Sequence, residues 1–407
     1  MITPIVHSFA KHKLTVVLLV VEVAITCALI CNVFHLAMVR VNDLKVPTGV
    51  DESHVTLIDN VMLDSVTDVV GAQRRDVGVL KGLDGVTAVA AVDAVPLSRN
   101  MWTLPLGTKP PGEQGNRIRK PNIYTGTPGT LQALGLRLLS GRDFLDNEFQ
   151  PEGSANHYIG VTRIGSAIVT AHLANEYFPG GNALGQGIFL PNGQPIRIVG
   201  IVDHLLRPQF KGLADADDSV LLPLLPDQSE VTYVLRTSAP PAAMLFDKAK
   251  AILAQASTQR LIRSVETFDD LRAEYFAGDV SMLRLLLAAG TGLIVVTIVG
   301  VAGLSNFWVL QRKRQIGIRR ALGATKSQIC HYFQVENLIL VGIGTVIGVA
   351  FAPLLARIIM KYAEAPALPL LVLPAAVLLF LVIGQCSVFA PALKASHIAP
   401  MAAIRKS

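Results

Sequence analysis

The side chains that could carry out chemistry do not form a recognised catalytic or metal-binding motif. Nine histidines and four cysteines are scattered along 407 residues without the spacing of metal ligands, and no nucleophile elbow ties a serine to a histidine and an aspartate. The nearest approach to a catalytic pair is Asp203 beside His204, which we interpret as a surface turn after the apolar segment 196–202. We therefore expect no catalytic, cofactor-binding or metal site, and a protein that is not an enzyme.

Nucleotide hydrolysis is not expected from this sequence either. Residues 323–327 read Gly-Ala-Thr-Lys-Ser, which lacks the glycine-lysine pair and the preceding strand of a phosphate-binding loop. The net charge of +6 comes from basic residues beside apolar segments, and therefore does not indicate a nucleic-acid partner.

The composition is that of a membrane protein. With 51% hydrophobic and 16% charged residues, the chain is too apolar for an ordinary soluble domain. Four apolar runs reach the roughly 20 residues that a helix needs to cross a lipid bilayer. We expect transmembrane helices at 14–38, 282–310, 335–360 and 368–390.

The segments that flank these runs predict the orientation of the chain. Eleven basic and no acidic residues lie in 1–13, 311–331 and the tail after residue 390, whereas 39–281 contains 22 basic and 27 acidic residues. Basic flanks are retained in the cytoplasm during insertion. We therefore expect a large domain outside the cytoplasm at 39–281, a short external loop at 361–367, and cytoplasmic segments at 1–13, 311–334 and 391–407.

The external domain is predicted to be α/β, with two lobes. Hydrophobic patterns indicate a strand, a helix and a strand between residues 54 and 95, and a second such set between 231 and 265. The two sets flank an insertion at about 97–220 that is rich in Gly and Pro and contains short apolar pieces. We expect one lobe that is split in sequence by an inserted mixed α/β lobe.

The loop between the second and third runs carries the most specific pattern, RKRQIGIRRALGATKSQI at 312–329. Its apolar and basic residues separate onto different faces, which predicts a short amphipathic helix broken near Gly323. The same basic residues would also hold the loop at anionic lipid and fix the topology. The residues that we select in this loop are Arg312, Lys313, Arg314, Ile316, Gly317, Arg319, Arg320, Leu322, Gly323 and Ala324.

Two carboxylates and four glycines stand out within the apolar runs. Glu22 and Glu336 are costly in hydrocarbon, so each should face protein, water or a basic partner such as a cytoplasmic arginine. We expect a structural role for Glu336, and favour interhelical pairing over a transport role for Glu22. Small residues permit two helices to approach closely. The four glycines are Gly300, Gly303, Gly344 and Gly348, and a dimer contact is one alternative for their role.

The segment 312–329 closely resembles the cytoplasmic signature of the MacB/FtsX permease family, a basic pair followed by EIGIRRALGA. Gln315 stands where the family commonly has Glu, which puts one polar contact of the loop in doubt. Further resemblances cover most of the chain: TPGTLQALGLRLLSGRDF at 127–144, ANEYFPGGNALGQGI at 174–188, IRIVGIVDH at 196–204 and PALKASHIAPMAAIR at 391–405.

The resemblance implies a permease in a bacterial inner membrane, with a porter-like periplasmic lobe and an inserted second lobe. Family members pair two permeases with two ATPases and transmit ATP-driven closure to the periplasmic domains, a mode called mechanotransmission. The resemblance implies that the residues selected in the loop couple it to an ATPase. Only thirteen residues precede the first run, so we expect the ATP and Mg²⁺ to be bound by separate ATPase subunits. The second permease is either another copy of this chain or a related one.

The resemblance also implies a function, with alternatives. We expect export of antimicrobial peptides, toxins or antibiotics, together with a periplasmic adaptor and an outer-membrane channel. Lipoprotein release, as in the Lol system, and signalling to a cell-wall hydrolase, as in FtsX, are the alternatives. The large two-lobed insert favours export over signalling, because the external domain of FtsX is smaller.

Overall fold

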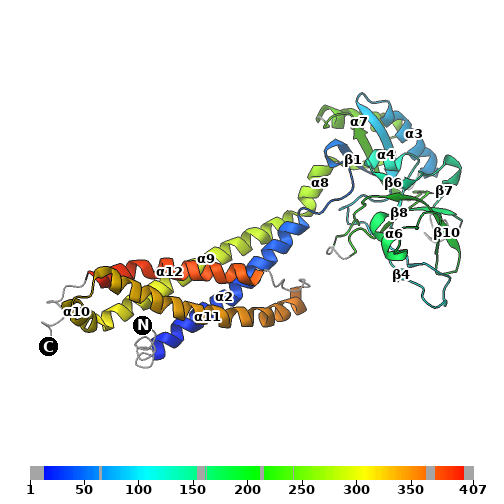
Figure 1. Ribbon diagram of the computed structural model, residues 1–407. Coiled ribbons are helices and arrows are strands. Elements are labelled where there is room, and N and C mark those ends of the chain that lie inside the picture. Colours follow the sequence, from blue (N-terminus) through cyan, green and yellow to red (C-terminus); the bar gives the residue numbers. More distant parts are fainter. Residues whose placement is uncertain are drawn as a thin grey trace. The chain divides into compact units, whose positions relative to one another are not determined.

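The structure, a computed structural model, describes residues 13–63, 67–153, 161, 163–210, 215–241, 243–363 and 372–397. The N-terminal segment expected at 1–13 lies outside these residues except for Lys13, as do most of the loop expected at 361–367 and the end of the tail expected at 391–407. The chain divides into two compact units, Met1–Leu44 with Gly278–Ser407, and Lys45–Ala277 (Figure 1).

The first unit is a helical bundle. Among the described residues, four helices are long and apolar enough to cross a membrane; they are α2 (Lys13–Asp43), α9 (Ala277–Gln311), α11 (Lys326–Ala363) and α12 (Val372–Ser396) (Figure 1). An α-helix makes most of its backbone hydrogen bonds within itself, as the hydrocarbon of a bilayer demands. Apolar side chains such as Leu285, Val299 and Val346 are exposed on the bundle, which is typical of a surface that faces lipid.

Helix α11 packs closely on α2 through two glycines. A Cβ atom at Gly344 would lie 2.8 Å from Cβ of Val23, and one at Gly348 would lie 2.6 Å from the carbonyl oxygen of Ala24. The small-residue pair of the third span is therefore used inside the chain, which leaves the dimer alternative without support there. At Gly303, by contrast, a Cβ would meet nothing within 4 Å.

The second unit contains a four-stranded antiparallel sheet in the order β14-β1-β13-β2. Its strands come from the two sets predicted on either side of the insertion: β1 (Val55–Met62) and β2 (Val86–Val92), then β13 (Glu230–Thr237) and β14 (Arg260–Thr267). Helices α3 (Val69–Lys81) and α7 (Ala243–Ala256) cover one face, where Leu80 and Leu253 pack on Ile58 and Tyr233. This is the lobe that the insertion splits in sequence.

The inserted lobe is built on a sheet in the order β4-β3-β9-β10-β8-β11-β5, with β6 paired to β10. The strands in chain order are β3 (Leu106–Gly107), β4 (Ile118–Arg119), β5 (Asn122–Thr125), β6 (Leu138–Gly141), β8 (Ser166–Thr170), β9 (Gly187–Phe189), β10 (Pro195–Val202) and β11 (Ser219–Leu222). Helices α4 (Thr130–Leu134) and α6 (Ala171–Tyr177) and the short pair β7 (Gln150–Pro151) and β12 (Leu224–Leu225) complete it. The mixed α/β lobe expected from the sequence is confirmed.

Two glycine-to-alanine variants test the packing of the bundle. Gly348→Ala should lower the stability of the detergent-solubilised protein by about 1–3 kcal/mol, because overpacking against a backbone oxygen forces α2 and α11 apart. Gly303→Ala is the matched control, and should leave stability unchanged or slightly higher, because alanine favours a helix more than glycine does. Thermal unfolding measures both, and equal midpoints would contradict the packing described here.

Candidate functional site

A buried ion pair lies at the junction of α9, α11 and the short helix α10 (Lys313–Ala321). Nη1 of Arg312 donates to both carboxylate oxygens of Glu336 at 2.9 Å, and both residues are at most 5% exposed. Arg312 is the residue before α10 begins, and Glu336 lies on α11. Removal of one member of such a pair leaves an uncompensated buried charge, which costs about 3–5 kcal/mol. Glu336 thus has a cytoplasmic arginine as its partner.

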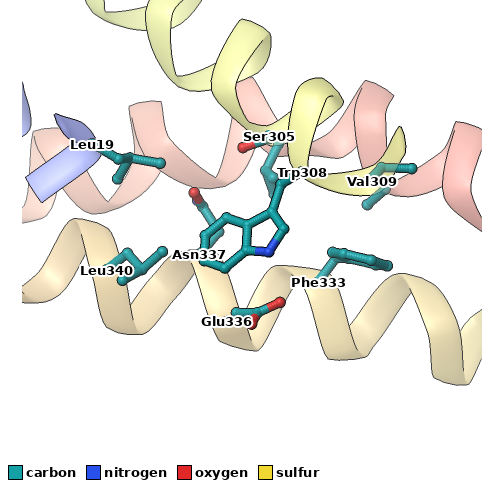
Figure 2. Close-up of a pocket in the computed structure, with 10 residues that line it drawn as sticks. Leu19, Ser305, Trp308, Val309, Phe333, Glu336, Asn337 and Leu340 are labelled. Atoms are coloured by element: carbon teal, nitrogen blue, oxygen red, sulfur yellow. The ribbon is translucent and has the colours of Figure 1, made fainter. Parts of the chain in front are cut away.

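Trp308 completes this junction. The guanidinium carbon of Arg312 lies 4.5 Å from the centroid of the Trp308 ring, a cation–π contact from the preceding turn of α9. Figure 2 shows the indole pointing from α9 towards α11, with Glu336 below it and Asn337 beside it. The pocket here has room for about one water molecule, with a volume of about 10 Å³. The side chains of the junction are therefore closely packed.

Helix α10 packs on the bundle through one apolar face. Ile316 is buried in a cluster with Val309 of α9, Phe333 of α11 and Ala392 of α12. Because three long helices contribute to this cluster, a displacement of α10 is resisted by all of them. Asn337 of α11 also donates to the carbonyl of Gly384 in α12 at 2.8 Å.

The break between α10 and α11 is specified by its local sequence. Gly323 has φ of +95°, a left-handed conformation that glycine adopts without a steric penalty. The amide of Ala324 donates to the carbonyl of Arg319, and that of Gly323 to the carbonyl of Arg320, which together close the helix in a Schellman motif. Thr325 and Gln328 then exchange side-chain and backbone hydrogen bonds in a capping box that begins α11.

The opposite face of α10 is exposed. Ile318 is 45% and Leu322 is 83% exposed, and Lys313, Arg314 and Arg319 are exposed beside them. Arg319 lies over the Tyr332 ring, with its guanidinium carbon 4.7 Å from the centroid, whereas Arg320 is half-buried. The residues selected from the sequence therefore divide into a buried set with Arg312, Ile316 and Gly317, and an exposed set with Arg314 and Leu322. Ile318, which was not selected, lies on the exposed side with them.

Glu22 is placed by a glycine on a neighbouring helix. A Cβ atom at Gly300 of α9 would lie 1.7 Å from a carboxylate oxygen of Glu22 on α2, so the Glu22 carboxylate occupies the space beside this glycine. Among the described residues, no basic side chain forms an ion pair with Glu22. Its neighbour is thus another helix, as the interhelical interpretation expects, but the contact is steric and involves no opposite charge.

Asp203 and His204 lie in the inserted lobe after β10. Nδ1 of His204 lies 2.6 Å from Oδ2 of Asp217, and the His204 side chain is partly exposed.

Two aromatic residues of the membrane unit were missed from sequence. They are Trp308, which contacts Arg312, and Tyr332, which contacts Arg319. The spacing of Trp308 four residues before Arg312 is a usable signal, but Tyr332 is brought to Arg319 only by the turn at Gly323.

The fold defines a polytopic membrane protein that carries a large second unit. Residues 47–265 match the MacB-like periplasmic core domain, and residues 287–400 match the FtsX-like permease C-terminal domain. The first match covers more than half of the chain, so the chain belongs to the MacB/FtsX-like family of ABC transporter permeases. The resemblance of the loop motif is confirmed, and the large domain is periplasmic.

The relatives are distant. The chain is 26% identical over 292 residues to the uncharacterized ABC transporter permease YknZ of Bacillus subtilis, which covers 68% of each chain. It is 27% identical over 294 residues to the macrolide export ATP-binding/permease protein MacB of Hyphomonas neptunium, which covers 66% of this chain and 41% of that protein. It is 25% identical over 257 residues to the pyoverdine export ATP-binding/permease protein PvdT of Pseudomonas aeruginosa, covering 58% of this chain and 37% of that protein.

Among solved structures, the periplasmic region of MacB from Actinobacillus actinomycetemcomitans is similar, with 12% identity and a TM-score of 0.33. The similarity covers 56% of this chain and 94% of that chain. By sequence, this chain spans about two fifths of the length of the MacB and PvdT proteins named above.

A double-mutant cycle tests the ion pair. Glu336→Gln alone, or Arg312→Met alone, should lower the unfolding free energy of the purified protein by about 3–5 kcal/mol, because each leaves one buried group unpaired. The double variant Arg312→Met with Glu336→Gln should recover part of that loss. Thermal unfolding in detergent gives the coupling energy, and additive effects of the two changes would show that the pair does not hold the junction.

Proposed function

We propose that this chain is the permease subunit of an export transporter, and that it relays the closure of a separate ATPase subunit to the periplasmic domain. The observation that carries the proposal is the two-sided construction of α10. Its inner face is buried against three helices, and its outer face exposes Ile318 and Leu322 beside basic side chains.

The outer face has the chemistry of a protein-docking surface. Ile318 and Leu322 are four residues apart, which is the spacing of anchors that enter a groove on a partner. Arg314 adds a positive charge at the same face, which favours an acidic rim on the partner. A push on this face reaches α9 and α11 directly, because the Arg312–Glu336 pair and Ile316 leave α10 little freedom to move alone.

The assembly that we propose contains two ATPase subunits, which bind ATP and Mg²⁺, and a second permease that is either another copy of this chain or a related one. Export is supported by the names of the relatives, among them macrolide and pyoverdine exporters, and by the large inserted lobe. A periplasmic adaptor and an outer-membrane channel would complete the path. The solid packing at Trp308 favours transport by movement of the periplasmic domains over passage between the membrane helices.

Charge reversal on the outer face tests the relay. Arg314→Glu combined with Leu322→Glu should abolish binding of the ATPase subunit, because it reverses one charge and buries another at the docking face. Lys394→Glu is the matched control, since Lys394 is an exposed basic residue at the end of α12. Membrane insertion, ATPase copurification and export are measured together; normal ATPase binding in the double variant would exclude the outer face as the docking site.

The mass of the detergent-solubilised complex with its copurifying chains distinguishes the functions. An ATPase, an adaptor and an outer-membrane channel are expected for export. Bound lipoprotein would indicate lipoprotein release, and a cell-wall hydrolase would indicate signalling. A functional complex without any ATPase would overturn the proposal.

A further inference from the structure

A cavity of about 520 Å³ lies in the periplasmic unit, on the face of the four-stranded sheet that α3 and α7 leave uncovered. Alternate residues of a strand point to opposite faces. Ile58 therefore packs under the helices, while its neighbours Leu57 and Asp59 line the cavity, together with Arg263 and Glu266 of β14. The volume lies in the range of binding sites for small molecules.

Both chain connections between the two lobes line this cavity. The outgoing connection contributes Asp93, Val95 and residues 98–100, and the returning one contributes Pro226 and Gln228. Within the outgoing connection, Leu97 and Arg99 have φ of 68° and 65°, a left-handed conformation that is uncommon for residues other than glycine. A molecule in the cavity would therefore contact the two segments on which any change in lobe orientation depends.

Acidic side chains outnumber basic ones in the lining. The charged residues are Asp59, Asp93, Glu230, Glu266, Arg99 and Arg263. Arg263 contacts both Asp59 and Glu230, so these two carboxylates share one counter-ion. The guanidinium carbon of Arg99 lies 5.3 Å from the centroid of the Tyr275 ring.

The two remaining carboxylates have no cationic partner among the described residues. Asp93 accepts a hydrogen bond from the amide of Thr125 at 2.8 Å, and Glu266 accepts one from the Ser264 hydroxyl at 3.1 Å. Burial raises the pKa of Asp93 to about 8, and burial with nearby carboxylates raises the pKa of Glu266. Carboxylates that are destabilised in this way gain from an added positive charge.

We propose that this cavity binds a small organic amine, whose protonated nitrogen is attracted by Asp93 and Glu266 and whose apolar part contacts Leu57, Val95 and Leu271. An anion is disfavoured by the excess of carboxylates, and a bare metal ion would leave the apolar lining unused. Export of that amine rests on the proposed function, but its binding does not. The full chain without any ATPase is therefore the material for the test.

Dansylcadaverine, a fluorescent primary amine, is a suitable probe, and its N-acetylated form is the neutral counterpart of nearly the same shape. Fluorescence titration of the purified full chain should give saturable binding of the amine, with affinity at least about tenfold lower for the acetylated form. Equal binding of the two compounds would overturn the proposal, because it would show that the charge is not recognised.

Variants locate the binding. Glu266→Gln should weaken binding of dansylcadaverine about tenfold, whereas Glu113→Gln, an exposed carboxylate of the inserted lobe outside the cavity, should leave it unchanged. Should Glu266→Gln fold poorly, Thr232→Phe, which fills the cavity from β13, should reduce the binding of both probes. Unchanged binding in the folded lining variants would place the site elsewhere.

The pH dependence gives an independent readout. Asp93 is protonated at pH 6 and ionised at pH 9, so the affinity for the amine should rise through about pH 8 and then level off. Asp93→Asn should remove this rise, and a flat profile for the unaltered chain would exclude Asp93 from the site. The groups that face Asp93 are Glu152, Tyr124 and the other charged residues of the lining; the pKa of Tyr124 lies well above this range because it is buried.

Discussion

The buried contact between Arg312 and Glu336 is the constraint on which the membrane unit depends. A charge in this position is tolerated only with its partner, so the end of α9 and the first turns of α11 must keep a fixed distance. Helix α10 connects these two helices, and its Ile316 contacts three helices. The exposed side of α10 is thereby held in a defined position, which a loop retained only by lipid charge would not achieve.

The membrane spans and the α/β class of the periplasmic domain were predictable from sequence, because they carry local signals. Apolar runs of about 20 residues suffice to identify a membrane span, and the two strand-helix-strand sets are visible in their periodicity. The break at Gly323 was also predictable, since it needs only a glycine and the capping residues Thr325 and Gln328. The observed helix α9 begins at Ala277, ahead of the expected start of the span at residue 282. The length of an apolar run predicts the part that crosses a bilayer, but does not mark where the helix itself begins.

The residue contacts between these elements could not be predicted, because each contact depends on how the elements pack against one another. Gly344 and Gly303 are the same residue in similar helices, yet one contacts Val23 closely and the other has nothing nearby. The pairing of Arg312 with Glu336 was expected only as one of several alternatives, since six basic residues lie in the same loop. The periplasmic cavity has no sequence signature, because Asp59, Asp93 and Glu266 meet only when the sheet places distant strands side by side.

The pairing of β1 with β14 has a mechanical consequence. Thr56, near the start of the periplasmic unit, is the register partner of Thr267, near its end, and the two strands run antiparallel. The two chain connections of the unit therefore leave the sheet at the same end of two paired strands. A displacement shared by both ends carries the sheet as a rigid body, whereas a force that separates the ends would unzip β1 from β14 one hydrogen bond at a time.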